Sequence, residues 1–479
     1  MKSIFFWNNR NLAGLLVALA VFTSCKKLIE IPPAPKNAIT QESQLVDSAN
    51  VVNAIVANYI YINQSSAGIP YGNSQLILVT GHSSDELAAG ANNFYNEFSD
   101  YAIVATNGTM GSTWRDMYKW LFSINAIINT VSVSTTMSPS FIKQATGEMK
   151  VMRAFYYFDM VNLFGGVPLV LNSDYKTTAS LPRASVEEVY AQIIKDLTEA
   201  SNDLIPAYPS AGRLRPNQYT ALTLLAKAHL YRQDWQKAYD AADRVIKSGL
   251  YTLEPDLNRV FLDGSTEAIW QITANSPNGT TNESSRFIPA NATSTPGYTI
   301  APSLLTALGL NVATGVPSVP TDQRYTKWVG KQPLTVGGVP RTFYYPFKYK
   351  NRVITVTPVE NYMMFRLGEV YLIRAEAAAR LNKLTEALAD VNIIRARAGL
   401  PASTANAASQ TDVLNAVMKE RQTELFTEWS NRWYDLKRTG MAATVLGALR
   451  PAWKPEAALY PIPQSQINLN FNLVQNPGY

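Results

Sequence analysis

Three glutamates have the type and spacing best suited to acid–base chemistry in this sequence. Glu420, Glu424 and Glu428 stand four residues apart, which places their carboxylates on one face of a helix. Two carboxylates supply the acid and the base of glycoside hydrolysis when they flank a scissile bond in a cleft. Like charges this close repel one another unless cations lie between them. We therefore predict a partly buried ion network that fixes helix register, with a surface hydrolase as the alternative. The expected cations are Arg421, Arg432 and Arg438.

The two histidines are the other candidates for catalysis. His82, in a polar segment with Asp85 and Glu86, is predicted to be exposed, and a Ser-His-Asp triad would have to use it or His229. No G-x-S-x-G nucleophile elbow accompanies it, and no EF-hand loop surrounds the two acidic residues, so calcium is possible but not indicated. His229 lies on the apolar face of a predicted helix and is expected to be structural. We predict no catalytic residue, no metal ligand and no cofactor.

The single cysteine, Cys25, follows a short apolar run that is preceded by basic residues. A basic start, an apolar middle and small residues at the cut are typical of a secretory signal. The run is too short to cross a bilayer as a mature helix, which disfavours a retained anchor. We predict that residues 1–24 are a signal peptide and that Cys25 becomes a lipidated N-terminus. The proline-rich residues 25–40 would form an extended tether.

Composition excludes several other classes of protein. The chain has 479 residues, of which 47% are hydrophobic and 16% charged, a globular rather than a disordered balance. The formal net charge is only +6, and no long run of Lys or Arg occurs, which argues against nucleic-acid binding. If Cys25 carries lipid, no disulfide can form, and packing alone must hold the fold.

Two segments match each other at a constant shift of 149 residues. Ala226, Ala228, Trp235 and Ala238 correspond to Ala375, Ala377, Leu384 and Ala387. Small residues allow two antiparallel helices to approach closely, and the large apolar residue after the turn wedges the pair. Such helix hairpins resemble tetratricopeptide units, although no fixed 34-residue period exists.

These patterns predict a mostly α fold built on a tetratricopeptide-like scaffold with a loop-rich irregular face and a few short strands. We expect helices over 41–250 and 363–450. A loop-rich insertion is expected over about 251–362, because Asn, Thr, Pro and Gly are frequent there. Residues 451–479 are expected to be a C-terminal tail, all within one unit spanning 41–479.

Several segments, taken together and in order, resemble the SusD/RagB family of outer-membrane lipoproteins. The segments begin at Cys25 and Arg153 and are densest towards the end of the chain: residues 25–33, 153–169, 369–376, 392–399, 420–428, 432–438, 460–464 and 475–479. The resemblance implies the helical fold and a lipid anchor in the outer leaflet of the outer membrane, facing the cell exterior.

The resemblance also implies a function and a partner. Members of this family capture oligosaccharides or polysaccharides, or in some cases peptides, and pass them to a SusC-like TonB-dependent transporter. We therefore expect a non-enzymatic, nutrient-binding surface protein with a glycan ligand. A peptide binder of the same architecture is the alternative, and the sequence does not identify the ligand.

Candidate ligand residues are chosen on local chemistry alone. A sugar presents an apolar C–H face, which a flat aromatic ring covers, and polar edges, which amides and cations orient. Aromatic residues in polar, loop-like surroundings fit this requirement, although core packing is the alternative for each of them. The candidates are Asn92, Asn93, Phe94 and Tyr95, then Tyr298, then Arg324 and Trp328.

Overall fold

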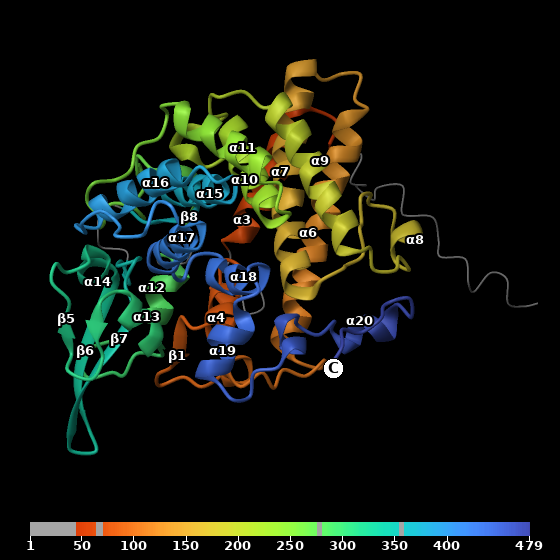
Figure 1. The fold of residues 1–479 in the computed structure, drawn as a ribbon. Helices are drawn as coiled ribbons and strands as arrows, with labels where there is room; N and C mark the ends of the chain where they lie inside the picture. Colours follow the sequence, from red (N-terminus) through yellow and green to blue (C-terminus); the bar gives the residue numbers. More distant parts are fainter. Residues whose placement is uncertain (1–44, 64–69, 275–279, 354–358) are drawn as a thin grey trace, which may run out of the picture. The chain divides into compact units, whose positions relative to one another are not determined.

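The computed structural model describes residues 45–63, 70–274, 280–353 and 359–479 (Figure 1). The predicted signal peptide, Cys25 and the tether lie outside these residues. Residues 45–479 form a single unit by their contacts. Among the described residues, none of the helices combines the length and the hydropathy that a bilayer crossing requires.

The predicted mostly α fold is confirmed. Many helices begin at a side-chain cap, as α9 does, where Ser185 and Glu188 form a reciprocal capping box. The helices are α3 (Ser48–Ile62), α4 (Gln75–Ser83), α5 (Asn96–Ser99), α6 (Gly108–Ser132), α7 (Pro139–Phe164), α8 (Tyr175–Thr178), α9 (Val186–Asp203), α10 (Gln218–Tyr231), α11 (Trp235–Lys247), α12 (Asn282–Phe287), α13 (Pro302–Ala307), α14 (Gln323–Trp328), α15 (Leu367–Arg380), α16 (Leu384–Arg397), α17 (Gln410–Glu424), α18 (Asn431–Arg438), α19 (Ala442–Leu449) and α20 (Gln464–Leu469), with 3-10 turns η1 (Ala211–Arg213) and η2 (Pro455–Ala458).

The two predicted helix hairpins are present as α10–α11 and α15–α16 (Figure 1). Their turns carry Gln233 at φ 63° and Asn382 at φ 59°, again 149 residues apart, so the match extends to backbone conformation. Ala228 and Ala377 are fully buried between the helices, as close packing requires. Helix α11 also packs on α15, which stacks one hairpin against the other.

The strands are short and form antiparallel pairs, β1–β3, β2–β8, β4–β5 and β6–β7, within the described residues. Pairing of β1 with β3 aligns Leu87 with Ile300 and Ala89 with Tyr298, which brings the segment after β1 beside Tyr298. The strands are β1 (Leu87–Ala89), β2 (Ala268–Thr273), β3 (Tyr298–Ile300), β4 (Leu310–Asn311), β5 (Val316–Pro317), β6 (Val329–Val336), β7 (Val339–Pro346) and β8 (Asn361–Arg366).

The C-terminal tail is tied to the helices by backbone and amide hydrogen bonds. Tyr460 N donates to Leu163 O at 2.8 Å. Asn476 Nδ2 donates to Phe164 O at 2.9 Å and to Tyr460 O at 2.7 Å. Tyr460 is fully buried. The tail therefore acts as a structural strap across the end of α7.

Candidate functional site

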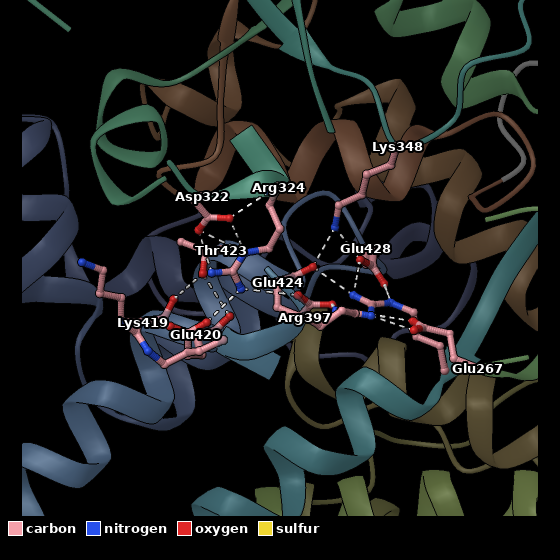
Figure 2. Close-up of polar contacts among 12 residues, drawn as sticks. Glu267, Asp322, Arg324, Lys348, Arg397, Lys419, Glu420, Thr423, Glu424 and Glu428 are labelled. Carbon is pink, nitrogen blue, oxygen red and sulfur yellow. Dashed lines mark hydrogen bonds and ion pairs between the residues drawn. The ribbon is translucent and has the colours of Figure 1, made fainter. Parts of the chain in front are cut away.

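The predicted ion network exists, and Glu424 is its centre (Figure 2). This side chain is 0% exposed. Its Oε1 accepts from Arg366 Nη1 at 2.6 Å and from Arg397 Nη2, and its Oε2 lies 3.4 Å from Arg324 Nη1. Burial alone raises the pKa of Glu424, but the three guanidinium groups outweigh it and hold that pKa far below its usual range.

The prediction that Arg421, Arg432 and Arg438 pair with these glutamates was wrong. The cations that reach the network come from other elements, because residues distant in sequence converge on α17 and the turn after it. Glu420 pairs with Arg324 at 2.8 Å and Arg395 at 2.7 Å, and Glu428 pairs with Arg366 at 2.8 Å. The predicted cations bind other carboxylates: Arg421 binds Asp435, Arg432 binds Asp85, and Arg438 binds Glu376.

The network has the properties of a structural element rather than of a catalytic pair. A glycosidase acid needs a raised pKa and access to substrate. Glu420, Glu424 and Glu428 are buried, and each is paired with at least one cation. The pKa of Glu428 is also lowered, because Arg366 and Lys348 outweigh the effect of its burial. The arrangement instead joins α17 to β8, α14 and α16.

Arg324 and Trp328 belong to this network and not to a ligand site, so their selection as ligand residues was wrong. Trp328 is 0% exposed, and its Nε1 donates to Leu257 O at 2.9 Å. Arg324 binds Asp322 and Glu420 through its guanidinium. Their segment has the composition of a polar loop, yet it folds as helix α14 with both side chains turned inward. Neither presents a surface to a ligand.

The exposure predicted for His82 was also wrong. His82 is fully buried, its Nδ1 lies 2.8 Å from Leu78 O, and burial lowers its pKa to about 4. Asp85 forms an ion pair with Arg432, with Arg432 Nε 2.6 Å from Asp85 Oδ1. His229 is buried with its Nδ1 3.1 Å from Asp234 Oδ2, as expected of a structural histidine. Among the described residues, no group of three His, Cys, Asp or Glu side chains is placed to hold a metal.

Four predicted ligand residues do lie together, around a pocket of about 600 Å³. Asn92, Phe94 and Tyr95 approach from the segment between β1 and α5, and Tyr298 from β3. Asn93 is exposed beside them but does not line the pocket. This pocket is the candidate functional site.

Backbone pairing fixes the two walls of the pocket against each other. Ala91 N donates to Pro296 O at 2.8 Å, and Asn92 N donates to Gly297 O at 3.0 Å. The Asn92 side chain continues the link, since its Nδ2 donates to Tyr298 OH at 2.7 Å while its Oδ1 accepts from Phe94 N at 2.9 Å. Asn92 thus orients both an aromatic ring and a phenol.

Of the aromatic residues, Tyr95 and Tyr298 form the buried floor of the pocket, and Phe94 projects from it. Tyr95 and Tyr298 are buried with ring centroids 5.8 Å apart, and burial raises the pKa of Tyr298 to about 12. Phe94 packs edge-on against Tyr95 at 5.0 Å and is 64% exposed. A large exposed ring at a pocket mouth offers an apolar face to a ligand.

Sequence reasoning missed the polar residues that line the rest of the pocket. They come from the segment before α4, the start of α4, α5, the start of α6, and α12, and no local pattern marks them. Asn107 caps α6 by accepting from Met110 N at 2.8 Å and donates to Glu97. The main polar residues are Asn73, Gln75, Glu97, Asn107 and Arg286.

Comparison with known proteins gives consistent matches. A family model described as "SusD family" matches residues 276–479, and one described as "Starch-binding associating with outer membrane" matches residues 35–230. SusD-like protein P2 of Formosa agariphila is 26% identical, covering 97% of this chain and 98% of its own. Starch-binding protein SusD of Bacteroides thetaiotaomicron is 34% identical over 24% of this chain and 21% of its own.

Solved structures match the fold over most of the chain. A SusD superfamily protein from Bacteroides vulgatus superposes with a TM-score of 0.77 at 19% identity, covering 91% of this chain and 100% of its own. A structure described as "Laminarin binding SusD-like protein" gives a TM-score of 0.71 at 25% identity, covering 90% of this chain and 99% of its own.

Proposed function

This chain belongs to the SusD family, and from that premise we propose that it is a cell-surface protein that captures oligosaccharides or polysaccharides without hydrolysing them. The carrying observation is the pocket of about 600 Å³, with the exposed Phe94 ring at its mouth and amides around it. The names of the starch-binding and laminarin-binding relatives support a carbohydrate as ligand.

The pocket matches what a sugar requires. Phe94 offers a face for the C–H side of a ring, and Asn73, Asn92 and Asn107 offer donors and acceptors for hydroxyl groups. When a sugar covers the Phe94 ring, apolar surface leaves water, which stabilises the complex by about 25 cal/mol for each Å² buried. Binding at one ring is therefore weak, and a polymer gains avidity by engaging several sites. Weak binding also permits release after capture.

The proposal includes an anchor and a partner. Lipid on Cys25 would hold the protein at the outer membrane, facing the exterior, and a SusC-like TonB-dependent transporter would receive the glycan. The family description that mentions association with the outer membrane supports this placement. The buried glutamates, each paired with a cation, support a protein that binds rather than cleaves.

Affinity electrophoresis against a panel of polysaccharides tests the proposal. We expect retardation by at least one glycan and a loss of about tenfold in affinity, or about 1.4 kcal/mol, in Phe94→Ala. Phe471→Ala is the matched control, because Phe471 is 90% exposed and does not line the pocket. Retardation by no glycan contradicts the proposal, and binding of peptide mixtures instead would favour the peptide-binding alternative.

A further inference from the structure

One cation of the pocket, Arg286, pairs with no carboxylate among the described residues. Arg286, near the end of α12, is half-buried, and its Nη2 donates to Asn73 Oδ1 at 2.7 Å. Within the described ranges this amide oxygen is the only acceptor that its guanidinium binds. A guanidinium carries five N–H donors, so most of the donors of Arg286 are unused by the part of the chain that the structure describes.

Several buried or partly buried arginines of the chain are paired with carboxylates. Arg153 binds Asp196 at 2.7 Å, Arg374 binds Asp390 at 2.7 Å, and Arg366 binds three glutamates. Taking a cation out of water is unfavourable unless an anion accompanies it. The half-buried Arg183 and Arg213 also lack a carboxylate partner among the described residues, but each donates to at least three backbone carbonyls. Arg286 has neither kind of compensation there, so its guanidinium can accept an anionic partner from outside the chain.

The charge of Arg286 acts on the floor of the pocket. Burial raises the pKa of both Tyr95 and Tyr298, and Arg286 opposes that shift at each phenol. The pocket also contains one carboxylate, Glu97, which accepts from Asn107 and forms no ion pair among the described residues. Burial raises its pKa as well. The pocket therefore has a cationic side at Arg286 and an acceptor side at Glu97 and Asn107.

We propose that this pocket prefers glycans bearing a single anionic substituent, a carboxylate or a sulfate ester, which Arg286 binds through its free N–H groups. The inference rests on the proposed function and names the ligand class of the same site. A carboxylate or a sulfate ester presents two oxygens that accept parallel hydrogen bonds from a guanidinium. The sugar hydroxyls then donate to Glu97 and Asn107, while the ring covers Phe94. One cation on the pocket wall matches one anionic group per bound sugar.

The test compares matched ligands by isothermal titration calorimetry. One arm uses a polyuronate oligomer and its carboxyl-reduced counterpart, and the other uses a sulfated oligosaccharide and its desulfated counterpart. We expect one acidic ligand to bind at least about tenfold more tightly than its neutral counterpart. Arg286→Gln should abolish that difference while changing affinity for the neutral ligand less than about threefold.

Arg341→Gln is the matched control, since it removes an exposed positive charge from β7, away from the pocket. Circular dichroism checks that each variant is folded. If Arg286→Gln does not fold, Arg286→Lys and a roughly tenfold increase in salt still test the proposal, because both should weaken binding of the acidic ligand selectively.

The outcomes separate this inference from the proposed function. Equal binding of acidic and neutral glycans, or an equal loss for both in Arg286→Gln, overturns the preference for an anionic group. Phe94→Ala would still weaken every glycan in that case, so glycan capture would stand. If the protein binds none of the glycans and Phe94→Ala therefore changes no affinity, both proposals are overturned.

Discussion

The fully buried Glu424 carboxylate forms ion pairs with three guanidinium groups. Bringing such charges out of water costs several kcal/mol for each ion, which only close pairing repays. Removing one member is therefore far more damaging than its hydrogen-bond count suggests. The residue holds several elements of the fold together, although its spacing in sequence resembles that of a catalytic acid.

We expect Glu424→Gln to lower the free energy of unfolding by about 3–5 kcal/mol, because it leaves three buried cations short of an anion. Urea titration followed by circular dichroism measures the loss. Glu187→Gln is the control, since the Glu187 side chain is 70% exposed and should change stability by less than about 0.5 kcal/mol. A variant as stable as the parent but lacking a hydrolytic activity would contradict a structural role.

A second buried glutamate should make stability depend on pH. Burial raises the pKa of Glu283 from 4.5 to about 8, and the neighbouring Glu360 also raises it. Between these two values the folded state holds a proton that the unfolded state has lost, so stability falls as pH rises through this window. Glu283→Gln should remove this contribution, so its stability relative to the parent should be higher near pH ~8 than near pH ~5. Urea titrations at both pH values, with Glu187→Gln as control, measure the free energy of unfolding of each variant. If Glu283→Gln depends on pH as strongly as the parent does, the expectation is contradicted.

At the scale of elements, the pocket depends on how closely two loops approach. Gly90 N donates to Gly297 O at 3.2 Å, and a Cβ atom on Gly90 would overlap Pro296 O. We expect Gly90→Ala to push the two loops apart, moving Asn92 away from Tyr298 and lowering glycan affinity about tenfold or more. Gly111→Ala on α6 is the control, because a methyl group added there would meet no atom within 4 Å. Equal affinities for both variants and the parent would contradict this account.

The elements themselves were largely predictable from the sequence. The alanine pattern at a shift of 149 residues identified both helix hairpins, because close helix packing is encoded locally in small side chains. The aromatic–amide cluster at Asn92 to Tyr95 identified one wall of the pocket. The cations of the ion network were not predictable, because Arg324 reaches Glu420 across 96 residues and Arg366 reaches Glu424 across 58. Arg286 was missed for the same reason.

At the scale of the whole molecule, the proposed outer-membrane anchor depends on Cys25, which lies outside the described residues. We expect Cys25→Ser to abolish acylation and release the protein from the outer-membrane fraction, because stable anchoring needs two or more acyl chains. Mass spectrometry of the N-terminal peptide and fractionation of cells measure both effects. Glycan affinity of the purified variant should be unchanged, and a variant that stays in the membrane fraction would contradict the anchor.

The pocket walls meet only after distant parts of the chain have come together, as Asn92 and Tyr298 do across 206 residues. No short fragment can reproduce this site, so ligand binds the native state alone. By mass action, a ligand at about 100 times its Kd then adds about 2.7 kcal/mol to the native state. A thermal-shift screen of a sugar library would therefore find the sugars that bind this pocket without any prior guess at their chemistry.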